Sequence, residues 1–465
     1  MIKFGTDGWR AIIAEDFTFQ NVKMVSQAIA DYLNREEKKR KRKKVVVGYD
    51  CRFLSKEFAT TVSLILAAND IRVTLSDRVV PTPAVSLHSL IDGYDLGIMI
   101  TASHNPFCFN GLKIKTKDGE AADSSLTNKV EKFLYKNKPR YIDLETAKKK
   151  KFLEFKCLID NYIEFLRKFV DIKRIKKIKL KILVDTMYGA TDKLVEKILG
   201  KSEIKIDYLH NEFNPSFGGV NPEPVEKNLQ ELIKKIKKEK YDLGVALDGD
   251  GDRISLIDSK GNFINAQIIL PLLAIHLIKN RKEEGGIGKT VVGSNLIDEV
   301  ASSLGIPFYE TPVGFKHISN LFKENLICIG GEEAGGIGFK GYIPERDGTC
   351  SFLLLLEMIA YENRSFDNLL KEIHKRYGKW YYQRIALPLN KVKKELDNLK
   401  LPSSLCGKKI ERINTLDGIK LITKDSWLMF RKSGTEPIVR IYAESKSRKE
   451  TEELLSLGEK IINAL

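Results

Sequence analysis

The feature that most constrains this chain is an internal repeat. Residues 94–100 read YDLGIMI and residues 241–247 read YDLGVAL, and each segment ends abruptly at a polar loop. A weaker third copy, at 326–329, runs into GGEEAGG. Short apolar runs that stop at polar residues are typical of buried parallel strands with functional loops at their carboxyl ends. A chain that repeats such a segment is expected to contain several related α/β units.

Each of these three strands follows two other strand candidates, with a segment of helical periodicity between them. We expect strands at 45–48, 71–75, 182–185, 204–209, 290–293 and 306–309, and helices at 58–69, 192–199 and 296–304. Alternation of this kind predicts α/β units with mainly parallel mixed sheets, in which ligands bind outside the carboxyl ends of the strands.

The length of 465 residues is enough for several domains. We expect three related units at 1–143, 150–262 and 263–375. The Lys-rich segment 147–151, which lies between two helical segments, marks the boundary between the first two units. From about residue 380 the pattern changes to adjoining strands followed by an amphipathic helix from Arg448. This predicts a smaller α+β domain at 380–465, and we expect the four domains to surround a central cleft.

The charge of the chain allows several partners. Lys and Arg number 78 against 62 Asp and Glu, a formal net charge of +16. Such an excess fits a nucleic-acid or membrane-surface protein, but it also fits an enzyme for anionic substrates with a Lys-rich surface. The basic run at 35–44 carries no interleaved aromatic residues that could stack on bases, so we expect no nucleic-acid partner.

Export and membrane insertion are not expected. The chain starts without a secretory signal pattern, and its longest apolar candidate, 352–356, is stopped by Glu357. The six Cys residues are scattered without a C-x-x-C pair, which favours buried free thiols in a reducing cytoplasm. We therefore expect a cytoplasmic protein, either a monomer or a homodimer.

Two glycine-rich segments resemble nucleotide-binding motifs only in part. GGIGKT at 285–290 has Glu283 at the place of the first P-loop glycine, and we expect it to precede a strand instead of following one. Residues 336–341 fit G-x-G-x-x-G but open no clear helix. Neither segment is interpreted as a phosphate-binding loop.

The loop after the second repeat predicts a metal site. Asp248, Asp250 and Asp252 alternate with glycines directly after a buried strand, so their oxygens can converge on one hard divalent cation. An EF-hand is excluded because Arg253 and Ser259 stand where Gly and Glu are needed. Mg2+ is the expected ion.

The loop after the first repeat, TASHNP at 101–106, carries a candidate nucleophile. Ser103 follows the end of a parallel strand, where its hydroxyl could act as a nucleophile or a phosphate carrier. His104 is either part of this chemistry or a hydrogen-bonding group that holds the loop. No G-x-S-x-G elbow is present, so a hydrolase triad is a poor fit.

Four motifs together resemble those of the alpha-D-phosphohexomutase (phosphoglucomutase/phosphomannomutase) family. They are TASHNP at 101–106, DGDGDR at 248–253, GGEEAGG at 330–336 and RKSGTEP at 431–437, in the order and approximate spacing of that family. The resemblance covers essentially the whole chain and is supported by FGTDGWR at 4–10 and PERDG at 344–348.

The resemblance implies a role for each loop. Ser103 would carry a phosphoryl group, and one oxygen of that group would complete the coordination of Mg2+ by Asp248, Asp250 and Asp252. The phosphoserine would donate its group to a hexose phosphate, giving a bound hexose 1,6-bisphosphate. Lys113 would exchange a proton with the sugar hydroxyl, helped by a lowered pKa. The catalytic set implied is Ser103, His104, Lys113 and Arg253.

Recognition of the substrate would use residues from other segments. Glu332 would accept hydrogen bonds from sugar hydroxyls, but Ala334 stands where the family has Ser. Phosphate would be bound by arginines, hydroxyls and backbone N–H groups. The substrate-binding set implied is Arg10, Gly314, Lys316, Glu332, Arg346, Arg431, Ser433, Gly434, Thr435 and Arg440.

The expected function is therefore a Mg2+-dependent mutase that interconverts the 1- and 6-phosphates of glucose, mannose or both. Glu333, at a position where the glucosamine-phosphate branch usually has Gln, argues against that branch. The alternative is a Mg2+-dependent sugar-phosphate phosphatase, which would not need the anion site of the fourth domain. Small hexose phosphates are the expected partners, with hexose 1,6-bisphosphate as activator and intermediate.

Overall fold

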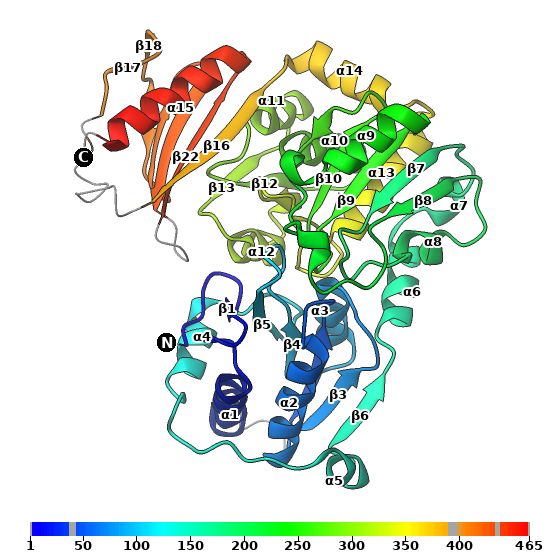
Figure 1. The fold of residues 1–465 in the computed structure, drawn as a ribbon. Helices are drawn as coiled ribbons and strands as arrows, with labels where there is room; N and C mark the ends of the chain where they lie inside the picture. Colours follow the sequence, from blue (N-terminus) through cyan, green and yellow to red (C-terminus); the bar gives the residue numbers. More distant parts are fainter. Residues whose placement is uncertain (1, 37–42, 389–398, 400, 433–437, 464–465) are drawn as a thin grey trace. The chain divides into compact units, whose positions relative to one another are not determined.

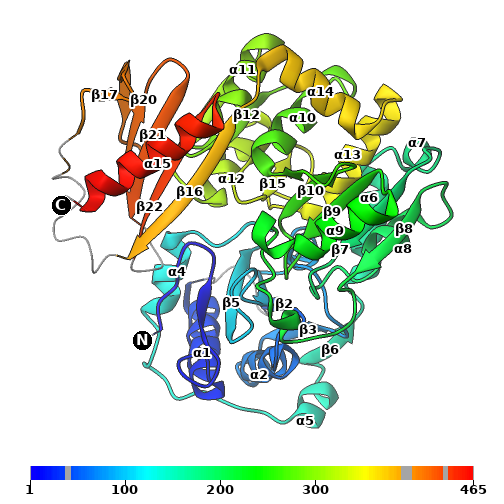
Figure 2. The same ribbon diagram turned by 45° about the horizontal axis from the view of Figure 1, so that its top comes forward.

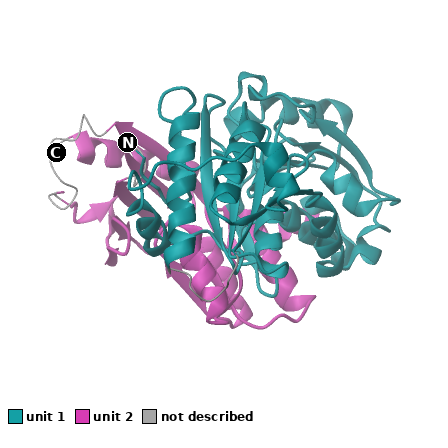
Figure 3. Cartoon of the chain, turned by 90° about the horizontal axis from the view of Figure 1, so that it is seen from below, with its two compact units in different colours: residues 1–266, 334–367 teal, residues 267–333, 368–465 magenta. Residues whose placement is uncertain are grey.

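The computed structural model describes residues 2–36, 43–388, 399, 401–432 and 438–463 (Figure 1). The chain divides into two units, which are coloured in Figure 3: unit 1 contains Met1–Ala266 and Ala334–Asp367, and unit 2 contains Gln267–Glu333 and Asn368–Leu465. Residues 334–367 group with unit 1 and not with the rest of the third unit expected at 263–375. The basic run of the sequence lies largely outside the described residues, at 37–42.

The first sheet, in unit 1, has six strands. Their order is β1 (Trp9–Ile12), β5 (Phe109–Thr116), β4 (Leu96–Ile100), β2 (Lys44–Tyr49), β3 (Arg72–Ser76) and β6 (Leu153–Lys156). The last four are parallel, and β5 is antiparallel to both β4 and β1. The helices of this region are α1 (Phe19–Glu36), α2 (Ser55–Ala68), α3 (Thr82–Ile91), α4 (Ser124–Glu131) and α5 (Leu144–Lys149). β6 belongs to this sheet although it follows residue 150, where we expected the second unit to begin, because it pairs with β3.

The second sheet, also in unit 1, confirms the repeat. Its order is β11 (Phe263–Ile264), β10 (Ile254–Asp258), β9 (Leu243–Leu247), β7 (Lys181–Asp185) and β8 (Lys205–Leu209). β9 is parallel to β7 and antiparallel to β10, as β4 is parallel to β2 and antiparallel to β5. Unit 1 also contains α6 (Ile159–Phe169), α7 (Ile172–Ile175), α8 (Leu194–Leu199), α9 (Gln230–Glu239), β15 (Ile337–Phe339) and α13 (Gly348–Glu362).

Unit 2 begins with strands of the third sheet. β13 (Phe308–Thr311), β12 (Gly286–Thr290) and β14 (Ile327–Gly331) are parallel neighbours in this order, accompanied by α10 (Ala266–Lys279), α11 (Asn295–Leu304) and α12 (Phe315–Lys323). The strand expected at 290–293 is wrong by a few residues, because β12 consists of the last five residues of GGIGKT. Its glycines allow close packing, since a Cβ on Gly286 would lie 2.3 Å from the Pro307 carbonyl oxygen.

The C-terminal part of unit 2 is the predicted smaller, sheet-rich domain. After α14 (Phe366–Tyr377), the antiparallel sheet has the order β16 (Tyr381–Pro388), β22 (Ile438–Ser445), β21 (Ser426–Lys432), β20 (Ile419–Ile422) and β19 (Arg412–Asn414). A small hairpin joins β17 (Ser404–Leu405) to β18 (Lys408–Lys409). α15 (Arg448–Asn463) lies along one face of this sheet (Figure 2) and packs on β16, β21 and β22. The architecture of three α/β domains with mixed sheets and a smaller fourth domain is thus confirmed.

The described helices and cysteines bear on two sequence expectations. Within the described ranges, no helix has both the length and the apolar character needed to span a bilayer. All six cysteines are free thiols, as expected. Cys406 is exposed, however, so the expectation that all the thiols are buried is wrong.

Candidate active site

The serine loop follows the carboxyl end of β4 in unit 1. Ser103 is buried and has a φ of +53°, a left-handed conformation that is uncommon for a residue with a side chain. Its hydroxyl donates a hydrogen bond of 2.9 Å to Oδ2 of Asp248, and His104 Nδ1 lies 3.4 Å from the same hydroxyl. The loops that follow the two repeated strands, β4 and β9, therefore meet at these side chains.

The three aspartates of the second loop form one buried cluster. Asp248, Asp250 and Asp252 are all fully buried, and each can offer one carboxylate oxygen within 4.8 Å of the others. Gly249 permits the close approach of the two loops, because a Cβ at this position would lie 2.6 Å from the Ser103 carbonyl oxygen. A positive φ of +74° at Gly251 then turns the chain between the second and third carboxylates.

The electrostatics of this cluster fit a divalent cation. Burial and the neighbouring carboxylates of Asp250 and Asp252 raise the pKa of Asp248 well above its usual range. Oδ1 of Asp250 and Oδ1 of Asp252 are buried and have no hydrogen-bond partner among the described residues. Hard carboxylate oxygens in this number are the ligands that Mg2+ or Ca2+ takes in proteins.

Lys113, on β5, neutralises part of this charge. Its Nζ lies 2.8 Å from Asp7, 2.8 Å from Asp250 and 3.1 Å from Asp252. Burial alone would lower the pKa of Lys113, but the three carboxylates outweigh it and raise the pKa above its ordinary value. This is the opposite of the lowered pKa that we expected. The three carboxylates therefore stabilise the side chain as an ammonium group and make it a weaker acid than a free lysine.

Arg346 and Asp7 extend the network. Nη2 of Arg346 lies 2.7 Å from Asp252 and 2.8 Å from Asp7. Asp7 also faces Arg10 at 3.4 Å, and Arg10 donates to the side chain of Asn105 in the serine loop at 2.7 Å. Burial opposes ionisation of Asp7, but Lys113 and Arg346 hold its pKa well below the usual range.

Asp7 was not singled out in the sequence, although the motif FGTDGWR that supplied Arg10 contains it. The signal that could have found it is a carboxylate three residues before a candidate phosphate-binding arginine.

Arg253 contributes in two ways: its backbone N–H donates to Oδ1 of Asp248 at 3.0 Å, and its Nε lies 3.7 Å from Asp252. The expected residues of the first two domains, with Arg346, are thus brought together within unit 1.

The candidate phosphate-binding residues of the C-terminal domain lie in unit 2. Arg431 on β21 and Arg440 on β22 are direct cross-strand partners, so their side chains share one face of the sheet. Arg384 on β16 is paired with Tyr442, two residues beyond Arg440, and lies on the same face. Like charges placed opposite each other are unfavourable unless an anion balances them. Ser433, Gly434 and Thr435 lie outside the described residues.

Other candidates of unit 2 lie near the ends of strands. Gly314 precedes α12 with a φ of +128°, and Lys316 lies in the first turn of this helix. The main-chain N–H of Val313 and Nε of Arg431 both donate to Asp417 Oδ2, each at 2.8 Å. Glu332 follows β14, and the next residue, Glu333, faces Arg384 at 3.8 Å.

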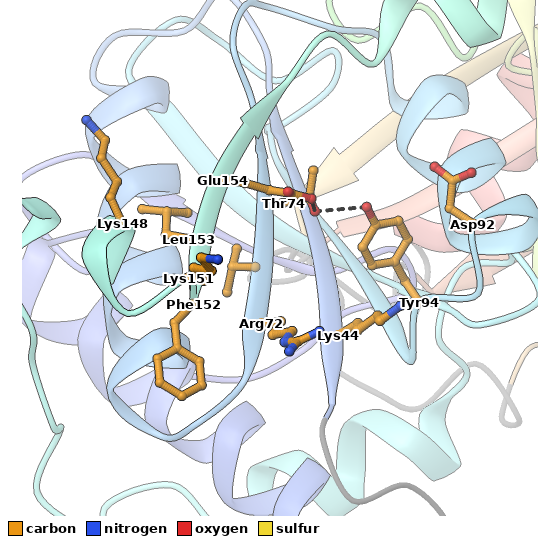
Figure 4. Close-up of a pocket in the computed structure, with 11 residues that line it drawn as sticks. Lys44, Arg72, Thr74, Asp92, Tyr94, Lys148, Lys151, Phe152, Leu153 and Glu154 are labelled. Atoms are coloured by element: carbon orange, nitrogen blue, oxygen red, sulfur yellow. Dashed lines mark hydrogen bonds between the residues drawn. The ribbon is translucent and has the colours of Figure 1, made fainter. Parts of the chain in front are cut away.

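Unit 1 also has a cavity of about 470 Å³ at the amino ends of β2 and β3 (Figure 4). Lys44, Arg72 and Lys151 line it together with Tyr94, whose hydroxyl donates to Thr74 at 2.9 Å. None of the expected catalytic or metal-binding residues lines this cavity. It is therefore separate from the site built at the carboxyl ends of β4 and β9.

Four family models match consecutive parts of the chain. The phosphoglucomutase/phosphomannomutase alpha/beta/alpha domains I, II and III match residues 1–140, 160–261 and 265–377, and the C-terminal domain matches residues 370–456. A phosphoglucomutase/phosphomannomutase from Thermococcus kodakarensis is 32% identical, over 99% of this chain and 98% of its own length. The chain belongs to the phosphoglucomutase/phosphomannomutase family.

Other members of the phosphoglucomutase/phosphomannomutase family carry different sugar names. A phosphoglucosamine/phosphogalactosamine mutase from Sulfurisphaera tokodaii is also 32% identical, over 99% of this chain and 98% of its own length. A crystal structure of a phosphomannomutase-like protein from Thermus thermophilus has a TM-score of 0.87 and 31% identity, with 99% of each chain covered. Family membership identifies a mutase-type enzyme of carbohydrate metabolism, and the names of its relatives leave glucose, mannose and glucosamine open as substrates.

Proposed function

We propose that this enzyme transfers a phosphoryl group reversibly between the 1- and 6-oxygens of glucose phosphate, mannose phosphate or both, through a phosphorylated Ser103 and a hexose 1,6-bisphosphate. The observation that carries the proposal is the hydrogen bond of Ser103 Oγ to Asp248 within a cluster of three buried aspartates, in a chain matched by all four family domains. Moving a phosphoryl group requires mainly positioning and charge neutralisation, and this cluster is suited to both.

The residues present fit a magnesium ion. Asp248, Asp250 and Asp252, with an oxygen of the phosphoryl group on Ser103, would hold it. The two buried carboxylate oxygens that have no hydrogen-bond partner in the described part of the chain are the groups that such an ion would satisfy. When bound, the ion neutralises negative charge on the transferring phosphoryl group. Lys113 and Arg346 neutralise further carboxylate charge around the same cluster.

In the forward transfer one proton moves from the sugar to the serine. The bond between Ser103 Oγ and phosphorus breaks, a bond between phosphorus and a sugar oxygen forms, and the proton of the sugar hydroxyl ends on Ser103 Oγ. We assign this exchange to Lys113, an ammonium group held by three carboxylates, with His104 beside the hydroxyl as a supporting group. Return of the other phosphate to Ser103 reverses these bonds.

We assign the second phosphate of the substrate to Arg431 and Arg440, with Ser433, Gly434 and Thr435, and the sugar hydroxyls to Glu332. Gly314, Lys316, Arg10 and Arg346 are further substrate-binding candidates. The cross-strand pair of arginines supports a mutase over a phosphatase, because a hydrolase has no second phosphate to hold. Glu333 supports glucose and mannose over glucosamine, whereas Ala334 lacks the hydroxyl that the family resemblance implies at this position.

The test is a coupled assay with Mg2+ and a trace of glucose 1,6-bisphosphate on glucose 1-phosphate, mannose 1-phosphate and glucosamine 1-phosphate. We expect turnover of the first, the second or both, and at least about tenfold weaker kcat/KM for glucosamine 1-phosphate. Turnover of glucosamine 1-phosphate alone would overturn the sugar assignment. Release of inorganic phosphate without isomerisation would establish the phosphatase instead.

A further inference from the structure

One buried arginine lies behind the serine loop. Arg52 follows β2, its side chain has no exposed surface, and none of the motifs that indicated function includes it. Its Nη2 donates to the carbonyl oxygens of Ser103 and Asn105, both at 2.6 Å. Its Nη1 donates to those of Pro106 at 2.8 Å and Phe109 at 3.0 Å. A single guanidinium group thus satisfies four carbonyl groups of residues 103–109.

Asp50 fixes the backbone on the amino side of Ser103, through Thr101. Its Oδ2 accepts a hydrogen bond of 2.6 Å from the hydroxyl of Thr101 and lies 3.4 Å from Nε of Arg52. The hydroxyl of Thr101 in turn accepts the backbone N–H of Ser103 at 2.8 Å. Both peptide groups that flank the Ser103 side chain are therefore fixed, one through Thr101 and Asp50 and the other by Arg52 directly.

This arrangement explains how Ser103 keeps its conformation. A left-handed φ at a serine is strained, and such strain persists only where the surrounding contacts determine the backbone more strongly than the residue itself does. The ring of Phe217 lies over the Arg52 guanidinium at 4.9 Å, which restricts the arginine from a second side. Lysine offers no such planar array of donors.

The direction of the backbone donors follows from the same contacts. In a planar trans peptide the C=O and N–H groups point in opposite directions. Because the Ser103 carbonyl points at Arg52, the N–H of His104 points away from Arg52. Holding this carbonyl thus fixes the orientation of a backbone donor adjacent to the residue that would carry the phosphoryl group.

We propose that Arg52, supported by Asp50, is a positioning residue for phosphoryl transfer: it holds loop 101–109 so that Ser103 Oγ stays hydrogen-bonded to Asp248. The proposal rests on the proposed function of Ser103. Arg52 is assigned no contact with the substrate. Its removal should slow transfer without weakening substrate binding, because the loop that presents the nucleophile loses its shape while the arginines assigned to phosphate are unchanged.

The first test uses Arg52→Ala in the full chain, with Arg78→Ala, an exposed arginine paired with Asp77, as the control. We expect kcat of the Arg52 variant to fall about 100-fold while KM stays within about threefold. Guanidinium chloride at low millimolar concentration should raise the kcat of the Arg52 variant about tenfold, because the free ion can occupy the vacated donor site. It should have no such effect on wild type or on the control.

Hydrogen exchange of loop 101–109 provides a readout that does not depend on turnover. We expect the Ser103 amide to exchange faster in the variant and to recover with guanidinium. A folded Arg52→Ala protein with wild-type kcat overturns the proposal, as does a loss of kcat with unchanged loop exchange. If the alanine variant does not fold, kcat and loop exchange are measured for Arg52→Lys and Thr101→Val without guanidinium, and the same two outcomes overturn the proposal.

The two failures can be told apart. If wild type isomerises none of the three hexose phosphates, the proposed function fails and the role of Arg52 in phosphoryl transfer fails with it; loop exchange then tests only whether Arg52 holds loop 101–109. If wild type is active and the variants keep both their kcat and their loop protection, the positioning role fails and the proposed function stands.

Discussion

Ser103 and Asp248 are separated by 145 residues in the sequence, yet a hydrogen bond of 2.9 Å joins their side-chain oxygens. Ser103 lies shortly after β4, and Asp248 directly follows β9. These two strands are the copies of the repeat, and they occupy corresponding places in their sheets. The proposed chemistry depends on this pair.

Replacement of Ser103 by Ala should abolish isomerisation, with kcat lowered by about 10⁴-fold or more, because no group remains to carry the phosphoryl. Intact-mass and peptide mass spectrometry after incubation with glucose 1,6-bisphosphate should find one added phosphate on Ser103 in wild type and none in the variant. Ser124→Ala, on the exposed start of α4, is the control and should keep both properties. Full activity of Ser103→Ala would refute the carrier role.

Asp248→Asn should separate metal binding from folding. The substitution removes one of three mutually repelling buried carboxylates, so the metal-free variant should unfold at a temperature no lower than wild type. Mg2+ should raise the unfolding temperature of wild type and leave that of the variant unchanged. Asp242→Asn, before the other end of β9, should keep the response to Mg2+. A magnesium-dependent rise in the Asp248 variant would contradict the assignment.

Lys113→Met should reduce kcat by about 10²- to 10⁴-fold, because it removes both a proton donor and the cation shared by Asp7, Asp250 and Asp252. Steady-state kinetics with glucose 1-phosphate measure this effect. Lys117→Ala, an exposed lysine just beyond β5, is the matched control and should behave as wild type. An unchanged kcat in Lys113→Met would show that another group exchanges the proton.

Arg431→Gln should act mainly on binding. Loss of a charge-assisted hydrogen bond to phosphate should raise KM about 10- to 100-fold, with a larger effect at low than at high ionic strength. The neighbouring Lys432, which is exposed, provides the control Lys432→Gln. Equal KM values for the two variants across a salt series would exclude Arg431 from phosphate recognition.

Asp347 should make stability depend on pH. Burial raises the pKa of this carboxyl to about 6, even though it accepts hydrogen bonds from Tyr342 at 2.6 Å and Tyr162 at 2.7 Å. Because the folded state holds the proton more tightly than the unfolded state, this group's contribution to stability falls as pH rises from about 4 to about 6 and is constant above.

Urea unfolding of wild type and of Asp347→Asn, measured between pH 4 and 8, tests this dependence. The difference in unfolding free energy between the two proteins should change by about 2–3 kcal/mol across the window and not above it. Asp171→Asn, which replaces the cap of α7 at a partly exposed position, is the control. A difference that is independent of pH would contradict the raised pKa.

The sequence was informative where local pattern and chemistry coincide. Alternating aspartates after an apolar strand predicted the buried cluster, and the repeated YDLG segment predicted corresponding strands in two sheets. GGIGKT was misleading because glycines usually mark turns, whereas in β12 they allow neighbouring chains to approach closely.

Arg52 and Asp7 were missed for a different reason. Their importance lies in the partners that the fold brings to them: four carbonyl groups of a distant loop for Arg52, and Lys113, Arg346 and Arg10 for Asp7. The raised pKa of Lys113 was missed for the same reason, since it depends on three carboxylates from two separate segments.

The return of residues 334–367 to unit 1 has a consequence for synthesis on the ribosome. β9 and β10 leave the ribosome before β12, β13 and β14, but α13, which packs on β9, β10, α7 and α8, leaves after them. The second sheet therefore has an uncovered apolar surface while most of the third sheet is being made. A nascent chain stalled before residue 348 should accordingly engage chaperones that bind exposed apolar segments, and one that has passed α13 should release them.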